Sequence, residues 1–81
     1  MKIKIKTFAS IKEACRFDEK ELTVSDGISV KEIMLELEKC HPTLKDFKKT
    51  ILCAINEEYC RPDSILSDED TLAIFPPVGG G

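Results

Sequence analysis

Apolar and polar residues alternate along Lys2–Phe8, with Ile3 and Ile5 on one side of the chain. A two-residue repeat is typical of a β-strand with one buried face. Glu19–Val24 alternates in the same way and is followed by turn-forming residues. The two stretches therefore predict an antiparallel pair of strands, with Ala9–Phe17 between them as a short helical turn or structured connection.

The clearest helical pattern covers Val30–Cys40. Ser29 occupies the expected N-cap position with Glu32 three residues later, which is a capping-box pattern, and Pro42 ends the segment. Apolar residues recur at the spacing of one helix face, at Val30, Ile33, Met34 and Leu37. This pattern predicts one amphipathic helix.

The second half of the chain contains shorter elements. Residues 44–51 form a weaker helical segment or a packed loop, and the apolar run Ile51–Asn56 predicts a strand in the middle of a sheet. Asn56 opens a tight turn, Glu58–Arg61 forms a short return strand, and Thr71–Phe75 forms the last strand.

The predicted order is strand, strand, helix, strand, short strand, strand. A helix that follows a hairpin has to cover one sheet face, which predicts a two-layer α+β domain. If the last strand pairs with the first, the two are parallel and the helix provides the crossover. The expected fold is the β-grasp, or ubiquitin-like, architecture, with a mixed sheet of four to five strands and one main helix on one face. We expect this domain to cover residues 1–78, with residues 79–81 as a flexible glycine tail.

Length and charge restrict the function. With 81 residues, 42% hydrophobic and 33% charged, the chain predicts one small globular domain that acts as a binding or carrier module rather than as an independent enzyme. Its 15 acidic and 12 basic residues argue against nucleic-acid binding, which requires a clustered basic face. Lys2, Lys4 and Lys6 are interpreted as a solvated strand face that discourages edge-to-edge pairing.

Neither a signal peptide nor a membrane-spanning run of about 20 apolar residues is apparent, so the expected location is the cytoplasm, without membrane association. The four cysteines are Cys15, Cys40, Cys53 and Cys60. In such a compartment they are expected to be free thiols, most of them buried as small apolar side chains, and their redox role stays open. Since the chain lacks a Cys-x-x-Cys motif and contains one histidine, we expect no metal site.

The last residues of the printed sequence suggest a chemical role. Phe75 is followed by two prolines, which fix φ and remove backbone donors, and then by Val78 and three glycines. From Val78 to Gly81 such a segment reaches roughly 13 Å at about 3.3 Å per residue. A tail this slim can enter a narrow cleft of another protein and present the carboxylate of Gly81, whereas the alternative is a frayed terminus without function.

Four segments together resemble a known family. They are Phe8-Ala9, Ala54-Ile55-Asn56, Leu66–Asp70 and Ile74–Gly81. The chain resembles the small subunit of molybdopterin synthase, in the MoaD family of ubiquitin-like sulfur carriers, over essentially its whole length. The ending Phe-Pro-Pro-Val-x-Gly-Gly is the specific marker, because a bare Gly-Gly is shared by all ubiquitin-like carriers.

This resemblance implies a mechanism in which the chain binds no cofactor and its partners supply catalysis. An adenylating enzyme, similar to MoeB, would consume ATP to convert the Gly81 carboxylate to an acyl-adenylate. A sulfur donor such as a cysteine desulfurase would then produce a thiocarboxylate. Two large subunits, similar to MoaE, would form a heterotetramer with two small ones and pass the sulfur to a pterin precursor. The product is the dithiolene that holds molybdenum or tungsten.

The resemblance also implies which residues contact the partners. Gly80 and Gly81 form the reactive end, and the expected docking residues are Phe8, Tyr59, Phe75, Pro76, Pro77, Val78 and Gly79. Phe8 and Tyr59 each end a strand and are expected to be partly exposed, while Phe75 could face either side. Glu69 stands where the family often has glycine, which is compatible with a type I turn.

Three other functions remain open. The first is a sulfur carrier for thiamine synthesis or tRNA thiolation. The second is a ubiquitin-like modifier whose Gly81 forms isopeptide bonds with lysines. A purely structural interaction domain is the third, and it leaves the glycine tail unexplained.

Overall fold

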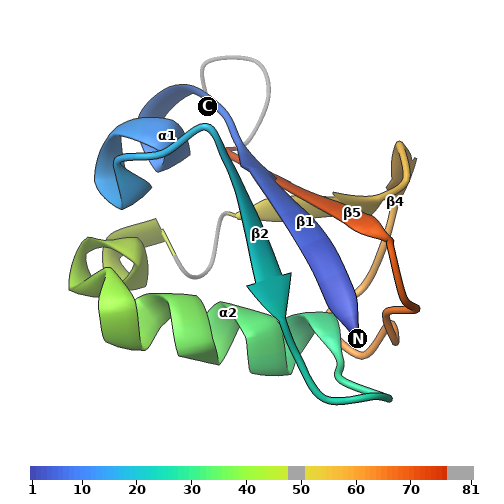
Figure 1. Cartoon of the computed structure of the whole chain (residues 1–81). Helices are drawn as coiled ribbons and strands as arrows, with labels where there is room; N and C mark the ends of the chain where they lie inside the picture. The colour runs from blue at the N-terminus through green and yellow to red at the C-terminus, as the bar shows by residue number, and fades with distance from the viewer. Residues whose placement is uncertain (48–50, 77–81) are drawn as a thin grey trace.

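A computed structural model describes residues 1–47 and 51–76 of the chain, and within these ranges five strands form one mixed sheet (Figure 1). The elements in chain order are β1 (Lys2–Thr7), α1 (Ala9–Cys15), β2 (Glu19–Thr23), α2 (Val30–Cys40), the 3-10 helix η1 (Pro42–Phe47), β3 (Leu52–Ile55), β4 (Glu58–Tyr59) and β5 (Thr71–Phe75). The predicted strands and main helix are confirmed, and the connection after β1 is a helix.

The sheet has the strand order β2-β1-β5-β3-β4. β1 is antiparallel to β2 and parallel to β5, and β3 is antiparallel to both β5 and β4. The first and last strands therefore lie side by side in the middle of the sheet, and α2 belongs to the connection between its two halves. This topology confirms the predicted β-grasp fold.

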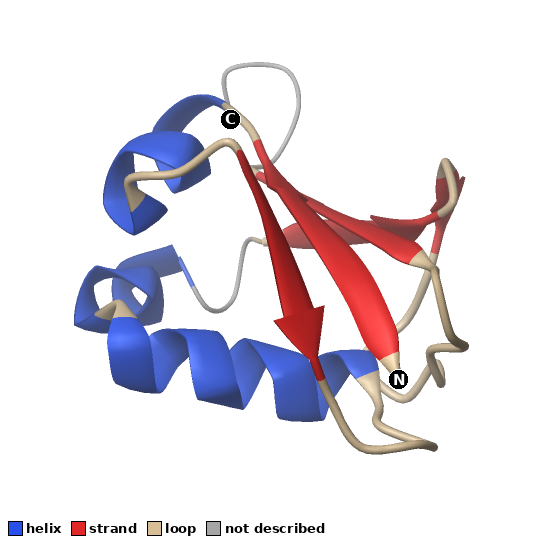
Figure 2. Ribbon diagram, in the orientation of Figure 1, coloured by secondary structure: helices blue, strands red, loops and turns tan. Residues whose placement is uncertain are grey.

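Helix α2 begins at its predicted capping box. The Glu32 backbone N–H donates to Ser29 Oγ at 3.2 Å, and the Ser29 backbone N–H donates to Glu32 Oε1 at 3.2 Å. The helix then lies across one face of the sheet (Figure 2). Its buried residues include Val30, Ile33 and Leu37, which pack into the core as the apolar periodicity predicts.

The core lies between this helix and the inward residues of the central strands. Burial alternates along β1, where Ile3, Ile5 and Thr7 are buried, and along β5, where Leu72 and Ile74 are buried. The buried Thr7 hydroxyl has a hydrogen-bond partner, because it donates to the backbone carbonyl of Phe17. This bond links the end of β1 to the residues that follow α1. The outward-facing residues of the same strands form the opposite face of the sheet, which no helix covers in the described residues and which we call the open sheet face.

The lysines of β1 have a different role from the one predicted. β1 is an inner strand, so Lys2, Lys4 and Lys6 lie on the open sheet face and do not protect an edge. Lys4 Nζ lies 3.0 Å from Glu19 Oε1, and Lys2 Nζ lies 3.8 Å from Glu21 Oε1. Such exposed pairs contribute under about 1 kcal/mol each, so they hold the side chains in place more than they stabilise the fold.

The turn before β5 also differs from the prediction. Glu69 has φ +68°, and the Asp70 backbone N–H donates to the Ser67 carbonyl at 3.1 Å. A type I turn requires a negative φ at this third position, so the expected type I turn is wrong. The reason is a long-range contact, since the Glu69 backbone N–H donates to the carbonyl of Lys2 at 2.6 Å and fixes the turn against β1.

Candidate functional site

Strand β5 determines where the candidate site lies. It ends at Phe75, and Pro76 is the last residue that the structure describes. Because β1 is parallel to β5, with Thr7 opposite Ile74, Phe8 follows β1 at the same end of the sheet. β3 runs the other way and starts there, with Leu52 opposite Phe75. The predicted site residues beyond this point, which are Pro77, Val78, Gly79, Gly80 and Gly81, lie outside the described residues.

Three aromatic side chains meet at this end, and we call Phe8, Phe75 and Tyr59 the aromatic row. The Phe75 ring centroid lies 6.1 Å from that of Phe8 and 5.7 Å from that of Tyr59, with interplanar angles of 77° and 61°. Edge-to-face pairs of this kind are favoured by the ring quadrupoles. The structure thus brings together three residues that lie far apart in the sequence.

Small residues between the strands make this contact possible. Tyr59 on β4 is opposite Ala54 on β3, and Ala54 is opposite Ala73 on β5. All three belong to the open sheet face, because residues directly opposite each other in a sheet share one face. Since Ala54 carries only a methyl group, the Tyr59 ring can reach across β3 to Phe75.

The aromatic row is largely solvent-exposed. Tyr59 is 71% exposed and Phe8 is 46% exposed, as predicted, and Phe75 is half-buried between them. Lys6 lies in the neighbouring register position, opposite Ala73, and forms no ion pair with any residue in the described ranges. Exposed rings beside a free cation are suited to bind a protein surface that carries apolar and acidic groups.

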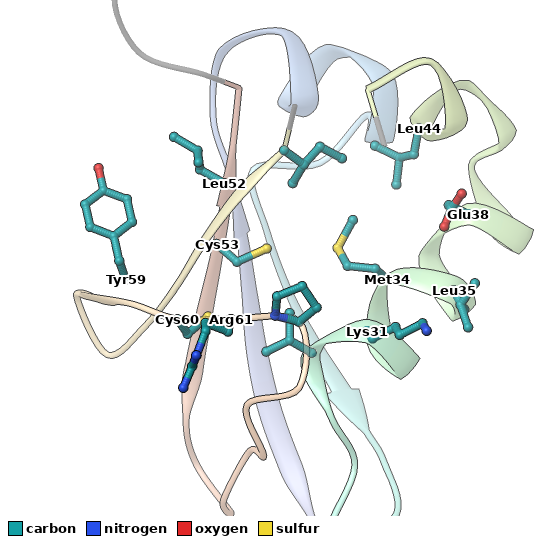
Figure 3. A pocket seen from close by; sticks show the side chains of 13 residues that line it. Lys31, Met34, Leu35, Glu38, Leu44, Leu52, Cys53, Tyr59, Cys60 and Arg61 are labelled. Atoms are coloured by element: carbon teal, nitrogen blue, oxygen red, sulfur yellow. The ribbon is translucent and has the colours of Figure 1, made fainter. Parts of the chain in front are cut away.

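A groove of about 750 Å³ opens on the other side of β3 and β4, facing α2 (Figure 3). It is mainly apolar, and its lining includes Met34 and Leu35 from α2 and Cys53, Cys60 and Pro62 from the sheet side. Figure 3 shows the Cys53 side chain pointing into the groove while Tyr59 points away from it. This groove was not predicted from the sequence. The symmetric placement of Cys53 and Cys60 around the turn at residues 56–57 was the signal available.

The described residues contain little that could perform catalysis. Residues 1–47 and 51–76 hold no cluster of three metal-ligating side chains, and no helix among them is long and apolar enough to cross a membrane. Burial raises the pKa of the Cys15 thiol, which packs in the core, and Cys40 is exposed at the end of α2. The expectation that most cysteines are fully buried is met by Cys15, since Cys53 and Cys60 are half-buried.

Comparisons with known proteins agree with the fold. The sequence matches the ThiS family over residues 5–81. It is 35% identical to the molybdopterin synthase sulfur carrier subunit of Chlamydomonas reinhardtii over 83 aligned residues, which cover 100% of both chains.

Two solved structures have the same fold. Molybdopterin converting factor, subunit 1, from Pyrococcus furiosus has a TM-score of 0.85 and 30% identity, covering 96% of this chain and 99% of that one. The small archaeal modifier protein 1 of Methanosarcina acetivorans has a TM-score of 0.80 and 31% identity, covering 99% of this chain and 96% of that one. With the β-grasp topology and a family match over residues 5–81, the chain belongs to the ThiS family.

Proposed function

We propose that this protein is the sulfur-carrier small subunit of a molybdopterin synthase, which presents a C-terminal thiocarboxylate on Gly81 to a catalytic partner. The observation that carries the proposal is the aromatic row at the end of β5, directly before Pro76 and the Pro-Val-Gly-Gly-Gly sequence. The row provides a docking surface at the point where the reactive segment begins. The full-length similarity to synthase sulfur carrier subunits supports the same role.

The proposed chemistry begins with a carboxylate that has no good leaving group. The Gly81 carboxylate is a poor electrophile until one oxygen becomes a good leaving group, so an adenylating enzyme consumes ATP to make the acyl-adenylate. Sulfide delivered by a sulfur donor displaces AMP and leaves a thiocarboxylate, which is a nucleophile at neutral pH. Glycines at positions 80 and 81 leave the reacting carbonyl unshielded, since neither carries a side chain.

The partner supplies the acid–base groups. Ordering a peptide tail in a cleft costs conformational entropy, so contacts of the globular face have to provide much of the binding free energy. The aromatic row and Lys6 are suited to do so at the large subunit and at the adenylating enzyme. We therefore assign this chain no catalytic side chain, and sulfur transfer to the pterin precursor takes place on the large subunit.

The test is the intact mass of the protein after incubation with ATP, an adenylating enzyme of the same family and a sulfide source. We expect a mass gain equal to replacement of one oxygen by sulfur, confined to the peptide that ends at Gly81 and absent without ATP. A variant lacking both Gly80 and Gly81 is the matched control, because it no longer ends in Gly-Gly, and it should show no gain. An unchanged mass with an enzyme that modifies its own carrier would exclude the carrier role.

A second function is favoured by one comparison. The likeness to a small archaeal modifier protein, at 31% identity, supports attachment of Gly81 to lysines of other proteins. Conjugation would produce a ladder of larger species on denaturing gels, resistant to thiols and dependent on Gly81. A ladder together with the mass gain would establish both roles, and a ladder alone would assign the modifier role.

A further inference from the structure

Cys53 and Cys60 are direct cross-strand partners. In the β3–β4 hairpin Ala54 is opposite Tyr59 and Ile55 is opposite Glu58, so one further step places Cys53 opposite Cys60. The backbone confirms this step, because the Cys60 N–H donates to the Cys53 carbonyl at 3.1 Å. Residues directly opposite each other in an antiparallel pair project from the same face of the sheet. Both thiols accordingly line the groove that faces α2.

The backbones at this position are close enough for a disulfide. Residues opposite each other in an antiparallel pair have Cα atoms about 4.5–5.5 Å apart, within the roughly 4.4–6.8 Å that disulfides span. Their Cβ atoms are about 4.5–5.5 Å apart and a disulfide needs about 3.5–4.5 Å, so the two side chains have to approach each other. Both residues are free thiols in this structure. Forming the bond therefore requires side-chain rotation and a small approach of β4, which is an edge strand of only two residues.

The Cys53 and Cys60 side chains are partly buried but can still be reached from solvent through the groove. Both side chains are half-buried, and the groove that they line is open to solvent beside Met34 and Pro62. Burial raises the pKa of Cys53 to about 11, with a further contribution from Cys60, and burial also raises the pKa of Cys60. The raised pKa values keep both groups mainly in the thiol form at neutral pH, so oxidation is expected to be slow and to speed up as the pH rises.

We propose that Cys53 and Cys60 form a reversible redox site, which a small disulfide such as oxidised glutathione converts from a dithiol to a cross-strand disulfide. The Cys60 thiolate, directly after the edge strand β4, attacks one sulfur of the oxidant, whose S–S bond breaks and releases one thiolate. The Cys53 thiolate then attacks the Cys60 sulfur, forms the Cys53–Cys60 bond and releases the second thiolate. The two protons of the cysteines end on the two released thiols, and the oxidant gains the two electrons.

Oxidation has a structural consequence at the docking face. Tyr59 precedes Cys60 and belongs to the aromatic row, while the Cys60 side chain lies on the groove side of the same strand. A covalent bond from Cys60 to β3 fixes β4 and with it the Tyr59 backbone. The redox state of Cys53 and Cys60 is thereby coupled to the position of the Tyr59 ring on the opposite face of the sheet. This site does not depend on the sulfur-carrier role.

The experiment treats the full-length protein with oxidised glutathione in a Cys15→Ser/Cys40→Ser background, because Cys40 is exposed and would form mixed disulfides of its own. We expect an intact mass lower by two hydrogen atoms, reversed by dithiothreitol. Combined cleavage after Lys and Glu separates residues 50–57 from residues 59–69, so the two peptides should stay joined only through the disulfide. As a second readout, fluorescence of Tyr59, the single tyrosine of a chain without tryptophan, should change on oxidation.

Single variants provide the matched controls. Cys53→Ser and Cys60→Ser should each accumulate a glutathione adduct in place of the mass loss, since the second thiol is missing. If the background protein instead accumulates adducts on Cys53 and Cys60 separately, or if both thiols resist the oxidant while folded and react only in urea, the proposal is overturned. If the Cys15→Ser/Cys40→Ser protein does not fold, the same test is carried out on the wild-type chain.

Discussion

The ring of Phe75 at the end of β5 meets the ring of Phe8 at the end of β1 edge-on, with centroids 6.1 Å apart. These residues end two parallel neighbouring strands whose sequence positions are far apart. Their contact brings the two rings together at the end of the sheet where Pro76 follows β5.

Truncation of the exposed rings should weaken partner binding while leaving the fold intact. We expect Tyr59→Ala and Phe8→Ala each to raise the dissociation constant for the large subunit about tenfold or more, as aromatic interface anchors do. The free energy of unfolding should fall by only about 1 kcal/mol, because Tyr59 is 71% exposed. Calorimetric titration and urea unfolding provide the two measurements.

Ile65→Ala is the control for these variants. Ile65 is 57% exposed and lies in the loop between β4 and β5, next to Ser29 and away from the aromatic row. It should leave the dissociation constant unchanged. Equal weakening by all three variants would mean that the row is not the docking surface.

Addition of one methyl group at Gly80 or Gly81 should reduce sulfur transfer without changing the stability of the fold. We expect Gly80→Ala and Gly81→Ala to keep the wild-type melting temperature and to reduce sulfur transfer by at least about tenfold, because a partner tunnel shaped for glycine excludes a Cβ atom. Thiocarboxylate formation is followed by intact mass and transfer by single-turnover assay. Normal transfer in both variants would show that the tail tolerates side chains.

Glycine at position 69 should stabilise the protein. Glu69 adopts φ +68°, a conformation that costs a side-chain-bearing residue roughly 1 kcal/mol and costs glycine almost nothing. We expect Glu69→Gly to raise the free energy of unfolding by about 1 kcal/mol in urea titrations. Glu69→Ala removes the same carboxylate but retains the strain, so it should show no gain, and equal gains in both variants would assign the effect to charge.

The Cys53 thiol should make stability pH-dependent at alkaline pH. Burial raises its folded-state pKa to about 11 from the ordinary value of 9.0, so between these pH values the folded state binds more protons than the unfolded state. Its contribution is therefore fully present below about pH 9 and is lost as the pH rises through 11. To isolate the Cys53 contribution, the measurement is the difference in unfolding free energy between wild type and Cys53→Ala. We expect this difference to fall with pH, and a constant difference would contradict the shift.

Local signals predicted much of the fold. The capping box at Ser29 and Glu32 and the apolar periodicity of α2 act within single turns, and for this reason both ends of the helix agree with the structure. Alternation along β1 correctly assigned Ile3 and Ile5 to the buried face. The exposure of Phe8 and Tyr59 also followed from their positions at strand ends.

Features that depend on strand order or register were not predicted. The lysines were assigned to an edge because the sequence pattern of a strand does not reveal how many neighbours it has. The conformation of Glu69 results from its hydrogen bond to Lys2, 67 positions earlier in the chain. Likewise, the pairing of Cys53 with Cys60 requires the hairpin register, which sequence spacing suggests but does not determine.

The central position of β5 has a consequence for the order of folding. β2 and β1 form one hairpin and β3 and β4 form another, and β5 joins them by pairing with both β1 and β3. The pairing of Lys4 with Thr71 spans most of the chain, so this junction forms late and carries a high loop-closure cost. Cleavage before Thr71 would therefore remove β5, which at once separates the two hairpins and takes Phe75 out of the aromatic row.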